Sequence, residues 1–301
     1  MKKVSGFLHF TQTFPTEQSC IEYYEKLRWN GKVISPFDEN SKVYKCKNGK
    51  YRCANTGKYF DVKTGTIFAN TKLPLRYWFY AMFLFLSHKR GVSSCQLARD
   101  LSITQKTAWG MLHKIRKYMK CANNAKLNNA VEIDETFVGG KNKNRHKDKK
   151  VERCQGRSFK DKVPVFGMYQ RNGKLIAKVV PNTKASTLMP LINEYINEGS
   201  IVFTDGWEYG DVKERYTQYS VDHGIGFYGT KLIDEGSGEI LNVCTNAIEN
   251  AWSHLKRTIF GTYYNVSKQY MQRYVDEFVF RFNTRKIRDI ERFDLLLCNT
   301  A

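Results

Sequence analysis

The sequence predicts a mixed α/β domain that follows a small β-rich region and a pair of short helices. Hydrophobic periodicity from residue 131 to residue 204 indicates a strand, a hairpin, a helix and a further strand in succession. Short strand-forming pieces separated by turn residues fill residues 31–66. Two helical patterns between residues 91 and 119 are joined by a short turn. We therefore expect three structural regions along one chain.

Composition favours a polyanionic partner. The 301 residues include 49 Lys and Arg against 29 Asp and Glu, a formal net charge of +20. The first residues lack the apolar segment and cleavage site of a signal peptide, and the longest apolar run, residues 77–86, is too short to span a bilayer. The eight cysteines form no CxxC motif, which fits reduced thiols. We expect a cytoplasmic protein that does not associate with membranes.

The first predicted elements are a helix over residues 16–29, capped by Thr16, and a ribbon of hairpins over residues 31–66. Ribbons of this size usually need four zinc-binding residues, because so few residues bury little surface. Only Cys46 and Cys53 lie in this ribbon, and it has no histidine. We therefore expect it to bind no zinc.

Residues 73–85 predict an apolar helix with Pro74 in its first turn. The next two helices, over residues 94–101 and 104–119, have the spacing of a helix-turn-helix motif around Ser102 and Ile103. An ordinary helical hairpin with a solvated basic face is the alternative. Because Gln and Lys lead the second helix, we favour a DNA-reading role. The side chains expected to face outward are Gln105, Lys106, Thr107, Lys114, Arg116 and Lys117.

Acidic residues mark the third region. The apolar run VEIDETFVGG at residues 131–140 contains Asp134, and an inward carboxylate in a strand is costly to bury without a partner cation. Asp205 ends a second apolar strand, VFTDG, and Glu249 lies in the helical segment NAIENAWSHLK. Two aspartates and a glutamate brought together by the fold can hold two divalent ions for phosphoryl transfer on nucleic acid.

The third acid has alternatives in Glu235, Glu239 and Asn246. The two glutamates lie in a Gly-rich segment, which gives a ligand little preorganisation, and Asn246 suits the helix N-cap. Glu249 could itself be a capping partner, but it shares a helical face with Lys256. We therefore prefer Glu249.

A basic tract follows the Asp134 strand. Residues 141–162 hold ten Lys and Arg against three acids. Such a run is ordinarily a solvated surface, but its position favours phosphate contact by Lys147, Lys149 and Lys150. The other predicted elements are strands at 163–170, 174–180 and 200–204, helices at 183–197, 247–259 and 268–283, and a loop at 222–239.

The segments VEIDETFVGGK, FTDGW and TNAIENAWSHLKRTIFGTYYNVS together resemble the DDE transposases of bacterial insertion sequences. The resemblance extends from about residue 17 to residue 294, and more specifically to the subgroup with an N-terminal zinc ribbon, a helix-turn-helix and a ribonuclease-H-like catalytic domain. It implies a degenerate ribbon region at 1–70, a helix-turn-helix region at 71–120, a linker at 121–130 and a catalytic α/β domain at 131–301, with helices flanking a mixed sheet.

The resemblance also implies an activity. Asp134, Asp205 and Glu249 would be the catalytic ligands of Mg²⁺ or Mn²⁺ in DNA cleavage and strand transfer, and Lys256 stands where related enzymes place a residue that touches DNA. The implied partners are double-stranded DNA, as element ends and target, and further copies of the chain in at least a dimer, on the nucleoid of a bacterial cytoplasm. A catalytically silent DNA-binding regulator and a non-transposing nuclease of the same fold are the alternatives. The family's zinc-binding CxxC pairs are incomplete here, with Ser35, Asp38, Cys53 and Thr56 at the four positions.

Overall fold

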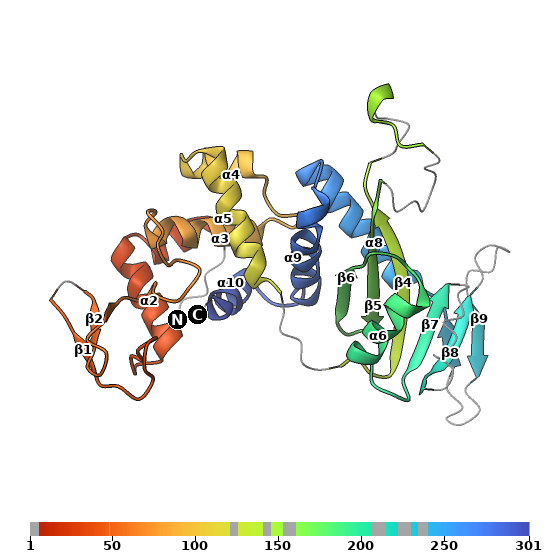
Figure 1. Ribbon diagram of the computed structural model, residues 1–301, viewed down its shortest axis with the longest axis horizontal. Helices are drawn as coiled ribbons and strands as arrows, with labels where there is room; N and C mark the ends of the chain where they lie inside the picture. Colours follow the sequence, from red (N-terminus) through yellow and green to blue (C-terminus); the bar gives the residue numbers. More distant parts are fainter. Residues whose placement is uncertain are drawn as a thin grey trace. The chain divides into compact units, whose positions relative to one another are not determined.

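The computed structural model describes residues 6–47, 49–120, 126–140, 146–152, 161–205, 215–221, 230–233 and 240–300, without the side chains of residues 149, 230–233, 240 and 241. The chain divides into two compact units (Figure 1). The first contains Met1–Met119 and Thr284–Ala301, and the second contains Lys120–Asn283.

The first unit begins with α1 (Phe7–Thr13) and α2 (Glu17–Trp29). As predicted, Thr16 caps α2. Its side chain accepts a hydrogen bond from the backbone N–H of Ser19, and the Ser19 hydroxyl accepts one from the backbone N–H of Thr16. Three short strands follow, β1 (Val43–Lys45), β2 (Tyr51–Cys53) and β3 (Tyr59–Phe60). They form an antiparallel sheet in the order β1-β2-β3, hereafter the N-terminal sheet. Helix α1 was not predicted.

Three helices complete the middle of this unit: α3 (Leu75–Ser87), α4 (Ser94–Leu101) and α5 (Gln105–Tyr118). Ser93 and Thr104 cap α4 and α5, and Ser102 takes the left-handed conformation that ends α4. One expectation was wrong. Arg116 is buried, and its guanidinium carbon lies 5.2 Å from the ring centre of Phe85. The long aliphatic stem of arginine lets it pack in an apolar contact that the hydrophobic periodicity does not count.

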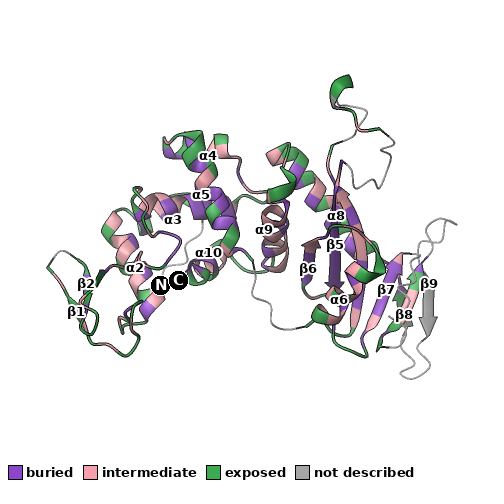
Figure 2. Cartoon of the chain, viewed as in Figure 1, coloured by how far each residue is buried: buried purple, intermediate pink, exposed green. Residues whose placement is uncertain are grey.

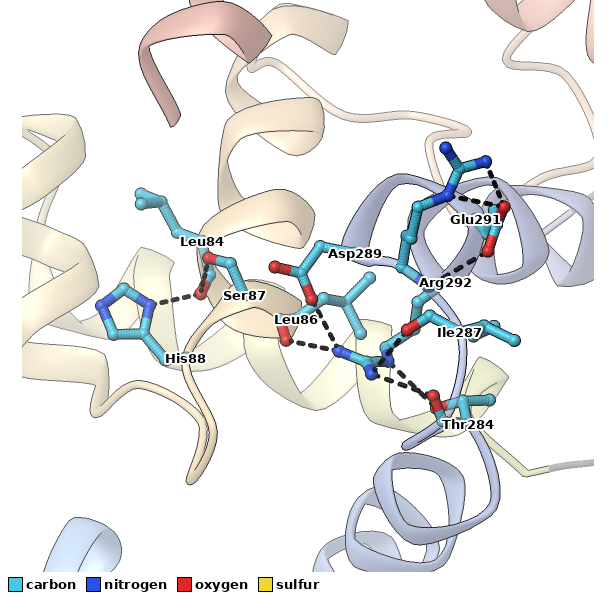
Figure 3. A network of polar contacts seen from close by, with 10 residues as sticks. Leu84, Leu86, Ser87, His88, Thr284, Ile287, Asp289, Glu291 and Arg292 are labelled. Atoms are coloured by element: carbon cyan, nitrogen blue, oxygen red, sulfur yellow. Dashed lines mark hydrogen bonds and ion pairs between the residues drawn. The ribbon is translucent and has the colours of Figure 1, made fainter. Parts of the chain in front are cut away.

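The end of the chain returns to the first unit as α10 (Asp289–Asn299). Arg292 joins it to α3 by donating to the carbonyl oxygen of Leu86 at 3.2 Å, and it also donates to the carbonyl oxygen of Thr284, just before α10, at 2.9 Å (Figure 3). Phe293 packs against the rings of Phe10 on α1 and of Phe79 and Phe83 on α3. Residues 284–300, which belong to the catalytic domain in the prediction from sequence, therefore pack with the N-terminal helices.

A five-stranded mixed sheet forms the centre of the second unit (Figure 1). Its order is β6-β5-β4-β7-β8. Strands β4, β5 and β6 are antiparallel neighbours, whereas β7 runs parallel to both β4 and β8. The strands are β4 (Ala130–Val138), β5 (Val163–Gln170), β6 (Leu175–Val179), β7 (Ile201–Asp205) and β8 (Thr217–Val221). The β5–β6 hairpin confirms the prediction, and β8 was not predicted.

Helices cover both faces of this sheet. Helix α6 (Ala185–Tyr195) buries Leu188 and Ile192 against Val131 and Ile133 of β4. Helices α8 (Asn246–Thr258) and α9 (Met271–Asn283) pack on the other face. The central strand β5, covered on both faces, is coloured almost entirely as buried in Figure 2. A π-helical turn (η4, Ile259–Tyr263) and a 3₁₀ turn (η5, Lys268–Tyr270) connect α8 and α9. This arrangement is compatible with a ribonuclease-H-like domain.

The segment expected to be a loop at 222–239 contains a strand. β9 (Thr230–Ile233) pairs with β10 (Ile240–Val243) in an antiparallel hairpin. The sequence analysis missed β9 because its short apolar segment lies between glycine-rich stretches, which are typical of loops. In the part of the chain that the structure describes, no helix is long and apolar enough to cross a membrane.

Candidate active site

Strand β4 places its even-numbered side chains on the face that α8 covers. Asp134 pairs with Gly167 of β5, and the neighbouring Ile133 pairs with Thr204 of β7. Continuing that parallel register by one residue sets Asp134 beside Asp205, the last residue of β7. Asp134 and Asp205 therefore occupy neighbouring strands on the same side of the sheet.

Helix α8 lies directly over this point because Gly167 has no side chain. A Cβ atom at Gly167 would overlap the ring of Trp252. Glu249 precedes Trp252 by three residues, about one helical turn, so it lies on the same side of α8. Close packing of helix and sheet thus brings Glu249 towards Asp134.

The three acids influence one another electrostatically. Burial raises the pKa of Asp134 to about 7, and the negative charges of Glu135, Glu249 and Asp205 add to this increase. Burial lowers the pKa of Lys256; Lys162 acts in the same direction, and Asp134 opposes it. These charge effects agree with the strand register and the helix packing, which set Asp205 and the Glu249 face of α8 near Asp134.

A buried glutamate that the sequence analysis did not assign holds the start of α8. Glu132 is 1% exposed. One of its carboxylate oxygens accepts hydrogen bonds from the backbone N–H groups of Ala247 and Ile248, both at 3.0 Å. The α8 N-cap, Thr245, provides no side-chain cap, so Glu132 satisfies donors that the helix itself leaves unpaired.

Arg171 completes this contact. Its Nε donates to the other carboxylate oxygen of Glu132 at 2.8 Å. Its terminal nitrogens donate to the carbonyl oxygens of Asn242, at 2.6 Å, and Cys244, at 2.8 Å. The guanidinium carbon also lies 4.0 Å from the ring centre of Phe203. Strand β4, the turn after β5 and the segment before α8 are therefore joined through one largely buried ion pair, and its Glu132 lies two residues before Asp134 on the same face of β4.

The start of α8 also bears on the third acid. The expectation that Asn246 caps the helix was wrong: the N-cap is Thr245, and Asn246 is the exposed first helical residue. Glu249 accepts a hydrogen bond from the Thr245 hydroxyl at 3.2 Å. Glu235 and Glu239 lie outside the described residues.

The donor chemistry at this site fits a divalent cation. Carboxylate oxygens are the ligands that Mg²⁺ and Mn²⁺ prefer. Burial, and after it the neighbouring acids, raise the pKa of Asp134, and a bound cation would favour its ionised form. Among the described residues, no three His, Cys, Asp or Glu side chains form a preassembled metal-binding group. Asp134, Asp205 and Glu249 thus lie near one another, but their carboxylates are not arranged as a complete metal-binding group in this structure.

The side chains expected to touch DNA fall in two places. Gln105, Lys106, Thr107 and Lys114 are exposed on α5, as is Trp109, which the sequence analysis missed although it lies three residues after Lys106. Gln105 donates to the Ser94 hydroxyl at 2.8 Å, and the Lys114 ammonium lies 5.8 Å from the ring centre of Trp78.

In the basic tract, Lys147 begins a short 3₁₀ turn (η2, Lys147–Lys149), and Lys147 and Lys150 are exposed. The side chain of Lys149 and residues 141–145 and 153–160 lie outside the description.

The residues at the four positions where the family has zinc ligands do not all lie together. Cys53 is buried, and hydrogen bonds from the hydroxyls of Ser35, Ser41 and Thr56 lower the pKa of its thiol to about 6. Asp38 instead accepts a hydrogen bond from the Asn55 side chain at 2.7 Å. Hydroxyl groups therefore surround the single cysteine of the four expected positions.

Comparison of the sequence with known proteins identifies the family of this chain. A model of the ISXO2-like transposase domain matches residues 126–283, more than half of the chain and almost the whole of the second unit. The chain belongs to the ISXO2-like transposase family. An uncharacterized protein in the transposable element ISH50 of Halobacterium salinarum is 27% identical over 236 residues, which cover 72% of this chain and 78% of that protein. An uncharacterized transposase-like protein of Haemophilus influenzae is 30% identical over 117 residues, 38% of this chain and 85% of that protein.

The matched region of this transposase family member contains Asp134, Asp205, Glu249 and Lys256. It begins beside β4 and ends with α9, so the family match coincides with the sheet and the helices that bring the acids together.

Proposed function

We propose that this chain is an insertion-sequence transposase that binds the DNA ends of its element and catalyses metal-dependent cleavage and strand transfer. Asp134, Asp205 and Glu249 are the proposed metal-binding acids. The observation that supports the proposal is geometric: the register of β4 and β7 sets Asp134 beside Asp205, and α8, which carries Glu249, packs on Gly167, the β5 partner of Asp134.

The proposed chemistry is phosphoryl transfer. In cleavage, a water oxygen forms a bond to the phosphorus, the bond to the 3′-oxygen breaks, and a 3′-hydroxyl is released. In strand transfer, that 3′-hydroxyl attacks a target phosphodiester, and the 3′-oxygen of the target strand leaves. Divalent ions bound by the three carboxylates would stabilise the attacking and leaving oxygens. Lys256 orients the DNA by binding a backbone phosphate with its ammonium group.

The experiment is an assay with labelled duplexes that carry the DNA flanking the reading frame in its genome. Purified protein with Mg²⁺ should cut this DNA and join the new 3′-end to a target plasmid. Binding without cleavage would instead support a DNA-binding regulator. Cleavage without joining would support a nuclease of the same fold. Glu198→Gln, an exposed glutamate of the same unit, is the matched control for Glu249→Gln.

We propose that α4 and α5 form the helix-turn-helix that reads the element ends. Support comes from the short turn at Ser102 and from the exposed Gln105 and Lys106 at the start of α5, where recognition helices contact base edges. The complex is proposed to contain at least two copies of the chain, since two element ends must be brought together. Light scattering with and without end DNA measures the copy number.

We also propose that the N-terminal sheet works without zinc. The hydrogen bonds that three hydroxyls direct to Cys53 supply local polar partners where the family has thiolate ligands. Elemental analysis of protein purified without chelators should find well under one zinc per chain. One tightly bound zinc would contradict this proposal.

A further inference from the structure

One face of the N-terminal sheet carries a continuous row of exposed side chains. Tyr44 of β1 pairs with Arg52 of β2, and Arg52 pairs with Tyr59 of β3. Directly paired residues point to the same face of a sheet, so these three form one row across all three strands. Tyr44 is 56% exposed and Tyr59 is 58% exposed, and Arg52 is also exposed. We refer to them as the Tyr–Arg–Tyr row.

The opposite face is already used for packing. Tyr51 and Phe60 are buried there, with ring centres 5.2 and 6.2 Å from that of Trp29 in α2. The fold therefore needs only one face of the sheet, and two tyrosines and an arginine remain on the other.

The surroundings of the row are strongly basic. Residues 42–59 contain six Lys and Arg and no Asp or Glu: Lys42, Lys45, Lys47, Lys50, Arg52 and Lys58. Three acids flank this segment in sequence: Glu39 is exposed, whereas Asp38 and Asp61 are engaged in turns. Asp38 accepts hydrogen bonds from Asn40 and Asn55, and Asp61 accepts them from the backbone of Lys63 and Thr64. The positive charge of this face is therefore complementary to a polyanion.

Within the described residues, the hydroxyls of Tyr44 and Tyr59 and the guanidinium of Arg52 make no hydrogen bond or ion pair. Exposed aromatic rings beside cationic groups form the surface on which nucleic-acid bases stack while their phosphates are neutralised.

We propose that the Tyr–Arg–Tyr row is a binding site for single-stranded DNA. Unpaired bases offer their faces to Tyr44 and Tyr59, whereas a duplex hides base faces inside its stack. Adjacent strands lie about 4.8 Å apart, so the two tyrosines are about 10 Å apart and each can hold its own base. Arg52 lies between them, where it contacts the connecting phosphate.

This site differs from the other proposed contacts of the protein with DNA. It recognises exposed bases rather than groove edges, and it requires neither the acids of the second unit nor a metal. Its binding can therefore be measured in the absence of divalent ions. A failure of the cleavage assay would leave this measurement unaffected.

The test uses the full chain and a fluorescein-labelled 12-nucleotide oligothymidylate, with fluorescence anisotropy as the readout. An abasic oligonucleotide of the same length is the second probe, since it has the same phosphates and no bases. The wild-type protein should bind oligothymidylate more tightly than the abasic strand. Tyr44→Ala combined with Tyr59→Ala should abolish this preference, with about 5-fold or greater weakening per stacked base. A 20-base-pair duplex should bind this variant normally.

Matched variants separate stacking from charge and from folding. Tyr44→Phe with Tyr59→Phe keeps both rings and should bind oligothymidylate within about 2-fold of wild type. Tyr44→Leu with Tyr59→Leu keeps apolar bulk without a ring for stacking, and it should lose the preference for oligothymidylate over the abasic strand. Tyr264→Ala removes a tyrosine that is 81% exposed in the second unit and should have no effect. Equal binding of the abasic strand and oligothymidylate by wild type, or normal base preference in the alanine or leucine variants, would overturn the proposal.

Discussion

At the scale of single residues, the assignment of the third acid is open to direct test. Glu249→Gln should lower Mg²⁺-dependent cleavage by at least ~100-fold, because it removes the charge of a proposed metal-binding carboxylate. Folding and end binding should be unchanged, since Gln can still accept the 3.2 Å hydrogen bond from the Thr245 hydroxyl. The measurement is the rate of cleavage of labelled end DNA, with circular dichroism as a check on folding.

Asn246→Ala is the informative comparison, because Asn246 is the exposed first residue of α8 and was the alternative ligand. It should cleave at nearly the wild-type rate. Normal cleavage by Glu249→Gln together with loss of cleavage in Asn246→Ala would move the ligand assignment to Asn246.

The residues of the site were predictable from sequence to different degrees. Asp134 was identified because a carboxylate inside an apolar strand is costly without a partner. Glu132 satisfies the same criterion, yet its role could not be assigned. Its partners, Arg171 and the start of α8, are 39 and 115 or more residues away in sequence. Periodicity identifies a face of a strand, but it does not identify which distant element will cover that face.

At the scale of elements, the contact between Glu132 and the start of α8 fixes how the helix that carries Glu249 meets the strand that carries Asp134. Glu132 is therefore expected to act as a positioning residue. Glu132→Gln removes the ion pair with Arg171 and weakens the cap on α8. We expect unchanged DNA binding and a several-fold higher Mg²⁺ concentration for half-maximal cleavage.

Glu277→Gln is the control for the loss of a buried charge. Glu277 is also 1% exposed, and it pairs with Arg281 at 3.0 Å within α9. Loss of one partner of a buried ion pair costs up to about 3–5 kcal/mol, so both variants should unfold at lower temperature. Only Glu132→Gln should change the Mg²⁺ requirement. An equal change in both variants would show that Glu132 contributes stability alone.

Helices α2 to α6, α8 and α9 and the central strands were predicted because each has a regular apolar pattern, whereas α1 and α10 were not predicted. Strand β8, TQYSV, was missed because it is largely polar, and the strands of the β9–β10 hairpin were missed because each has only four residues. Helix α10 illustrates a different limit. Its apolar face is visible in the sequence, but whether that face packs on the second unit or on the N-terminal helices depends on tertiary structure.

The return of the chain to its first unit gives a prediction about α10. Phe293 is fully buried, with its ring centre 5.1 Å from that of Phe10 and 5.3 Å from that of Phe79. Phe293→Ala should lower the free energy of unfolding by about 3–5 kcal/mol, because it leaves a cavity in an aromatic core. Leu295→Ala, at a position that is 41% exposed on the same helix, should cost far less. Urea unfolding followed by circular dichroism measures both.

At the scale of the whole molecule, the net charge of +20 means that much of any DNA affinity arises from phosphate contacts and falls as salt rises. Binding strength alone therefore cannot identify a recognition element. The dependence of affinity on salt and on sequence must be measured separately for α5 and for the basic tract. End DNA and a scrambled duplex of equal length, each titrated at several salt concentrations, provide both measurements.

Gln105→Ala with Lys106→Ala should reduce the preference for end DNA over the scrambled duplex, because residues that lead a recognition helix contact base edges. Neutralising Lys147, Lys149 and Lys150 to Gln should instead weaken binding to both duplexes. It should also reduce the slope of log affinity against log salt by about one for each lost phosphate contact. A triple variant at the exposed Lys26, Lys184 and Lys268 removes the same total charge elsewhere and should leave the slope nearly unchanged. If the tract variant alters sequence preference and the α5 variant does not, the two roles are reversed.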